Sequence, residues 1–115
     1  MMEPLEKIVK ALAAGAANNL RPNSRGLENT AVSNQFYALK ALLARKYAKV
    51  DEGVLDIGPA SAERQQQIKA QLQDVSADED EEVLQQAEVL LTAVKEHDPK
   101  ALWASTPIEA LSTRS

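Results

Sequence analysis

Residues 4–19 read PLEKIVKALAAGAANN, and this segment carries the clearest helical pattern in the sequence. Pro4 suits a first helical turn, because its missing N–H would be unpaired there in any case. Apolar side chains then recur with the i, i+3, i+4, i+7 spacing of one buried helical face, at Leu5, Ile8, Val9, Leu12 and Ala16. The second half consists of small residues, which let a neighbouring helix approach closely. We therefore predict a helix from Pro4 to about Asn19.

A second helix is predicted over roughly Thr30 to Lys49, after a turn-rich loop at residues 21–29. Its apolar stripe consists of Val32, Phe36, Leu39, Leu43 and Val50. Three further residues widen this stripe: Tyr37, Leu42 and Tyr47. Residues 51–59 form a connector. We expect its apolar side chains to lie in the core as a short turn, namely Val54, Leu55 and Ile57.

Two further helices complete the predicted bundle. The third runs from Pro59 or Ser61 to Asp74 on a thin stripe of Ala62, Ile68, Leu72 and Val75. The fourth begins at a capping-box pattern, Ser76 to Glu79, and runs to about Glu96 before Asp98-Pro99 ends it. Its apolar positions are Val83, Leu84, Ala87, Leu90, Leu91 and Val94.

The predicted fold class is all-α: a four-helix bundle with a short connector turn and a C-terminal tail. The bundle domain is expected at residues 1–98, and residues 99–115 are a tail or linker, either a short docked segment or a mobile one. We expect Trp103 to pack back onto the bundle; an interface with a partner or with a membrane surface is the alternative.

Composition agrees with this fold class. A chain of 115 residues suffices for one domain, and Ala, Leu, Gln, Glu and Lys outnumber aromatic and β-branched residues. The absence of cysteine excludes disulfide scaffolds and thiol nucleophiles. The N-terminus does not resemble a signal peptide, and the longest uncharged run, Ala11 to Leu20, is too short to span a bilayer. A cytoplasmic resting state is therefore expected.

Charge is divided unevenly along the chain. Residues 1–50 carry eight Lys or Arg and three Asp or Glu, whereas residues 51–115 carry five and fourteen. This asymmetry either marks a basic surface for anionic partners or draws the two halves together inside one bundle, and we favour the second interpretation. Nucleic-acid binding is not expected, because no basic stripe with interleaved aromatics is present.

Residues for enzyme chemistry are almost absent. His97 is the only histidine, and its place at a predicted helix C-terminus beside Asp98 indicates a cap or surface role. No nucleophile elbow, P-loop or zinc-protease motif is present. The acidic run Asp78 to Glu82 lacks the glycine and the spacing of a calcium loop. We therefore predict no enzyme activity, no catalytic residue, no metal site and no cofactor.

Five segments together resemble a known family. They are Glu3 to Ala17, Tyr37 to Leu43, Arg45-Lys46-Tyr47, Ala62 to Gln65 and the acidic Asp78 to Glu82. In this order they are similar to bacterial Bell domains, which are thought to be related to fungal HeLo-type domains and to the four-helix executioner domain of the necroptosis pseudokinase. The resemblance covers about residues 3–98 and rests on helix order and composition.

The resemblance implies a membrane-perturbing, regulated cell-death effector domain of a bacterial NLR-like or amyloid-signalling immune system. Such a domain is quiescent in the cytoplasm, is clustered by an NLR-like receptor or an amyloid-motif partner, and then disrupts the inner membrane as a self-oligomer. Carried onto this chain, the membrane-active helix is the first one. Its lipid-facing stripe then consists of Leu5, Ile8, Val9 and Leu12. Lys7 and Lys10 would contact the lipid headgroups.

One departure from the family keeps a second interpretation open. Lys100 to Ser115 lacks the repeated polar and β-prone residues of an amyloid motif, so either the motif lies outside this chain or the trigger is different. The alternative function is a non-toxic helical adaptor or protein–protein interaction module of a bacterial immune or signalling system. Its basic and acidic halves would stack head to tail in a heterologous assembly.

Overall fold

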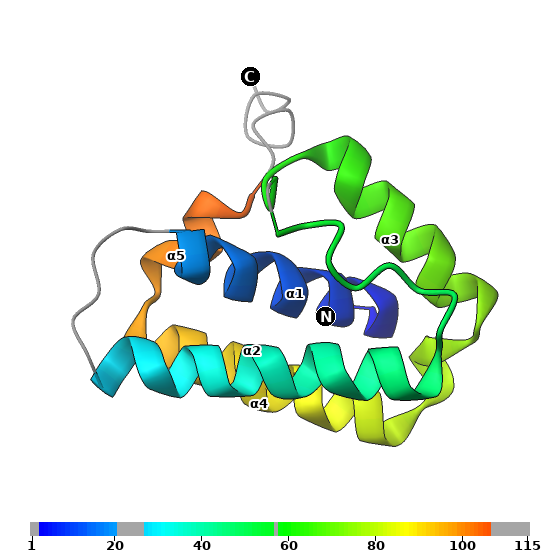
Figure 1. The fold of residues 1–115 in the computed structure, drawn as a ribbon. Helices are drawn as coiled ribbons and strands as arrows, with labels where there is room; N and C mark the ends of the chain where they lie inside the picture. Colours follow the sequence, from blue (N-terminus) through cyan, green and yellow to red (C-terminus); the bar gives the residue numbers. More distant parts are fainter. Residues whose placement is uncertain (1–2, 21–26, 57, 107–115) are drawn as a thin grey trace.

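The apolar pattern of residues 4–19 produces a central helix. The computed structural model describes residues 3–20, 27–56 and 58–106. Helix α1 (Pro4–Leu20) contacts every other helix, with α2 (Leu27–Lys46) and α4 (Glu81–His97) running alongside it (Figure 1). Helices α3 (Ala62–Asp74) and α5 (Lys100–Ala104) cover another part of its surface. In the described ranges all regular secondary structure is helical, which confirms the all-α prediction.

The core is built from the stripes that periodicity predicted. All five stripe positions of α1 are buried, and α2, α3, α4 and the connector contribute fully buried side chains such as Phe36, Leu39, Leu43, Leu55, Ile68, Leu72 and Leu90. Burying each large aliphatic or aromatic side chain contributes about 1.5–3 kcal/mol relative to leaving it exposed. Ile57, predicted for the same core, lies outside the described residues.

The small residues of α1 let α2 approach as expected. Ala13, Ala14, Ala16 and Ala17 are all buried. A Cβ added at Gly15 would lie 2.4 Å from Cδ1 of Phe36, so only glycine fits there without movement of the ring. The second half of α1 is therefore fixed against α2 by shape as well as by hydrophobicity.

Three predicted helix bounds were wrong. Helix α2 begins at Leu27 rather than near Thr30, inside the predicted loop. Helix α2 ends at Lys46 rather than Lys49, because the Val50 N–H bonds the Tyr47 carbonyl in a turn that still buries Val50. The capping box at Ser76 does not form: Ser76 has a left-handed φ of 57° and makes no side-chain cap. A 3-10 helix, η1 (Ala77–Glu79), follows, and Asp80 caps α4 instead.

Two aromatic predictions also failed. Tyr37 is 54% exposed, and Trp103 is 72% exposed, so neither belongs to the core. Helix α5 attaches to α1 through its buried Ala101 and half-buried Leu102, which leaves Trp103 on the outer side. Residues 100–104 are thus a docked segment, the first of the two alternatives for the tail. The domain boundary at residue 98 stays a prediction.

Candidate functional site

The four side chains predicted to face lipid lie inside the protein. Leu5, Ile8, Val9 and Leu12 are each no more than 9% exposed and belong to the hydrophobic core. Helix periodicity places Ile8 and Gly15 on one face of α1 and Glu6, Lys10 and Ala13 on the opposite face, with Val9 between them at the edge of the apolar stripe. These residues become available to another surface only if α1 leaves its neighbours.

The two lysines assigned to lipid headgroups have different surroundings. Lys7 Nζ lies 2.9 Å from Glu88 Oε1 on α4, and its hydrogen bond and charge lower the pKa of Glu88. Lys10, one turn further along α1, is half-buried in the lining of a pocket and has no ion-pair partner among the described residues. Lys7 therefore helps to hold α1 against α4, whereas Lys10 has no such pair in the part of the chain that the structure describes.

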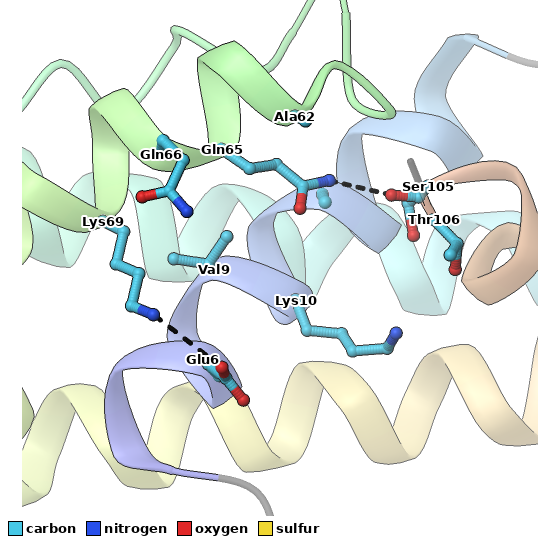
Figure 2. Close-up of a pocket in the computed structure, with 10 residues that line it drawn as sticks. Glu6, Val9, Lys10, Ala62, Gln65, Gln66, Lys69, Ser105 and Thr106 are labelled. Atoms are coloured by element: carbon cyan, nitrogen blue, oxygen red, sulfur yellow. Dashed lines mark hydrogen bonds and ion pairs between the residues drawn. The ribbon is translucent and has the colours of Figure 1, made fainter. Parts of the chain in front are cut away.

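A pocket of about 370 Å³ lies between α1, α3 and the end of α5. Figure 2 shows its two ends: a Glu6–Lys69 ion pair at 3.7 Å, and the Gln65 Nε2 that donates to the Ser105 carbonyl at 2.8 Å. The remaining lining residues are Val9, Lys10, Ala13, Ala62, Gln66 and Thr106. Sequence patterns gave no signal for this pocket, because it depends on how far α3 stands from α1.

A polar cluster joins the end of α2 to the start of α4. Asp80 accepts hydrogen bonds from Tyr47 Oη at 2.6 Å and Lys46 Nζ at 2.9 Å, and from the backbone N–H groups of Glu82 and Val83. The bond from Tyr47, aided by Lys46, lowers the pKa of Asp80 to about 2. The same bond raises the pKa of Tyr47.

This Asp80 cluster brings together two segments that the sequence singled out separately. Arg45-Lys46-Tyr47 and the acidic Asp78 to Glu82 carried part of the family resemblance, and they meet here across α2 and α4. The opposite charges of these two segments were the feature of the sequence that could have predicted this cluster. Because Asp80 also caps α4, the cluster fixes the two helices that run beside α1.

Charge pairing follows the asymmetry of the chain. Cations from the first half pair with anions from the second at Lys7–Glu88, Lys40–Asp56, Arg45–Glu82 and Lys46–Asp80. The Lys69–Glu6 pair joins the two halves in the opposite sense. This pattern agrees with the interpretation that the two halves attract each other within one bundle. Surface pairs of this kind contribute up to about 1 kcal/mol each, so they orient the helices more than they stabilise them.

Three remaining features concern the histidine, possible metal ligands and possible membrane-spanning helices. His97 is exposed and ends α4, as expected from the sequence. Across the described ranges, acidic, histidine and cysteine side chains form no group of three or more that could hold a metal ion. None of the helices described is both long and apolar enough to cross a bilayer.

Comparison with known protein families identifies a relationship over most of the chain. A family model described as HetE-N, the Het-E N-terminal domain, matches residues 2–105, which takes in α1 through α5. Searches of the curated proteins and of the solved structures gave no significant match.

Proposed function

Because this chain belongs to the Het-E N-terminal domain family, a family of HeLo- and HET-related cell-death domains, we propose that it acts on a membrane after clustering. In this proposal α1 is the active element. The bundle keeps α1 buried at rest, and clustering shifts the equilibrium toward a state in which α1 is released. The upstream partner would be an NLR-like receptor or an amyloid-motif protein, and the bacterial Bell assignment stays a prediction.

The observation that supports this proposal is the burial of the apolar stripe of an amphipathic helix at the centre of the fold. Leu5, Ile8, Val9 and Leu12 would supply an apolar face after release, and Lys7 and Lys10 would lie outside that face. Lysines near an anionic membrane contribute about 1 kcal/mol each. Burial at rest accounts for a domain that is harmless until it is clustered.

The length of α1 favours a position along the membrane surface. Its 17 residues reach about 25 Å at 1.5 Å per residue, which is shorter than a hydrocarbon core of about 30 Å. An amphipathic helix of this length lies in the interface with its apolar side inserted. Several copies would then thin or break the bilayer together.

The test begins with bacteria that express residues 1–115 alone or fused to an inducible oligomerisation module. We expect growth arrest and dye entry only after clustering. Healthy cells that contain a well-expressed, folded and clustered domain would contradict the proposal.

The lysine variants need a matched design. Lys7→Glu alone would place two carboxylates together and loosen α1, because Lys7 pairs with Glu88. Lys7→Glu/Glu88→Lys keeps the pair while it removes the cation from α1. We expect this exchange, combined with Lys10→Glu, to retain the fold and to weaken dye release from anionic vesicles. Unchanged release would argue against a headgroup role.

A second candidate function is the adaptor, and the exposed Trp103 favours it. An indole that is 72% exposed is an unusual feature for a monomeric surface, and Trp is enriched where proteins bind each other. An adaptor would bind its partner with α1 in place. Trp103→Ala should then abolish partner binding, whereas the membrane proposal expects dye release after clustering to persist in that variant.

A further inference from the structure

The pocket between α1, α3 and α5 has the composition of a small-molecule site. Its volume of about 370 Å³ lies at the small end of the range for ligand pockets, about 300–1,000 Å³. Val9, Ala13 and Ala62 give it an apolar floor. Polar side chains stand around that floor, as in sites that fix the orientation of a ligand.

The charges in the pocket leave one cation uncompensated. Glu6 pairs with Lys69 at one end, while Lys10 extends toward the other end, near Ser105 and Thr106 (Figure 2). Lys10 is half-buried and lacks an ion pair with any residue in the described ranges. An anion bound there would form a charge-assisted hydrogen bond with the Lys10 ammonium.

Few other hydrogen-bond donors are available at the Lys10 end. The hydroxyls of Ser105 and Thr106 both donate to the Leu102 carbonyl. The Gln65 amide donates to the carbonyls of Pro59 and Ser105. A phosphate, with three acceptor oxygens and nearly two charges, would be poorly matched, whereas one ammonium suits one carboxylate.

We propose that this pocket binds a small amphiphilic carboxylate, with the carboxylate on Lys10 and a short hydrocarbon chain over Val9, Ala13 and Ala62. The walls come from α1, α3 and the end of α5, so the ligand binds only when these elements are together. Binding therefore stabilises the assembled bundle by mass action. If the proposed function holds, such a ligand keeps α1 in its resting position.

The binding test uses octanoate with the purified 115-residue chain in the absence of membranes. We expect saturable shifts of amide NMR signals from the pocket residues on α1, α3 and after α5. We also expect a rise in Tm of about 5 °C at a concentration about ten times the dissociation constant. The neutral probe 1-octanol should bind at least about tenfold more weakly, because it lacks the charge that Lys10 recognises.

Two variants and one control complete this test. Lys10→Met should abolish octanoate binding, and Ala62→Leu should block it by filling the pocket. Lys49→Met, which removes an exposed lysine outside the pocket, should leave binding unchanged. Octanoate binding that persists in Lys10→Met, or an absence of saturable shifts in the wild-type chain, would overturn the proposal.

The readouts separate this proposal from the membrane function. Octanoate binding in solution together with harmless clustering in cells would retain the pocket and reject the effector. Dye release by the clustered domain without octanoate binding would retain the effector function and reject the pocket as a carboxylate site. Where both hold, octanoate should delay dye release by the wild-type domain and have no effect on Lys10→Met.

Discussion

Helix α1 is held in different ways on its two faces. Toward α2, Gly15 lies against Phe36 with no room for a Cβ, and Ile8, on the same face, is fully buried. Toward α3 and α5, a pocket of about 370 Å³ intervenes, with the Glu6–Lys69 ion pair at one end and the Gln65 amide that donates to the Ser105 backbone carbonyl at the other. We call these the tight face and the pocket face of α1.

The difference predicts the order in which α1 loses its neighbours. Close-packed apolar contacts resist separation because each lost contact exposes surface to water. Exposed ion pairs and hydrogen bonds exchange readily with water and contribute little net stability. We therefore expect α3 and α5 to separate from α1 before α2 and α4 do.

Truncation on the tight face should have the largest effect. Ile8→Ala removes a side chain with 0% exposure and should lower the free energy of unfolding by about 2–5 kcal/mol, measured by urea denaturation. Val89→Ala on α4, where the side chain is 40% exposed, is the control and should cost less than about 0.5 kcal/mol. Equal losses for the two variants would remove the distinction.

Substitutions that add side-chain volume should have the next largest effect, and this effect should differ between the two faces of α1. Gly15→Ala forces Phe36 to move and should cost about 1–3 kcal/mol as overpacking, reduced by the better helix propensity of alanine. Ala13→Val adds volume beside the pocket, where space exists, and should cost less. A larger loss for Ala13→Val in the same denaturation experiment would mean that the pocket face is as closely packed as the tight one.

Acid should weaken the Asp80 cluster, which fixes α2 to α4. The folded pKa of Asp80 is about 2, below its ordinary value, so its stabilisation is present above about pH 4 and is lost as the pH falls toward 2. With solvent screening this amounts to about 1 kcal/mol. Asp80→Asn keeps an oxygen for the cap and should flatten the pH dependence of Tm in this range; an unchanged slope would contradict this assignment.

The smallest change is expected from the ion pair on the pocket face. Glu6→Gln should cost less than about 0.5 kcal/mol, because the Glu6–Lys69 contact is long and exposed. Native-state hydrogen exchange is the more sensitive measurement: amides of α3 should exchange faster while those of α1 keep their protection. Faster exchange in α1 alone would reverse the proposed order of separation.

Sequence reasoning reached the helices and the core because both depend on repeated local spacing. The stripe of α1, its small-residue half and the buried Val54 and Leu55 of the connector followed from that spacing. The start of α4 did not, since Ser76 takes a left-handed conformation and Asp80 is held by side chains more than 30 positions away.

The functional surfaces were also harder to predict, because they depend on contacts between residues that are far apart in the sequence. Lys10 and Lys7 look alike in the sequence, yet only Lys7 has an acidic partner on α4. Trp103 looked like a core residue, but the five residues of α5 bury Ala101 instead. The pocket combines residues from three separate elements, and no spacing within any one of them indicates it.

A reversible lock on the tight face tests the central claim that α1 must leave the bundle to act. The chain has no cysteine, and a Cβ at Gly15 would lie 3.1 Å from the Phe36 Cβ, close to the disulfide range of about 3.5–4.5 Å. The measurement is dye release from anionic vesicles by clustered Gly15→Cys/Phe36→Cys, oxidised or reduced. Circular dichroism would verify the fold of both forms, and the two single variants would control for the reductant. We predict no release while the disulfide is closed and release after reduction; equal release in both states would contradict the account.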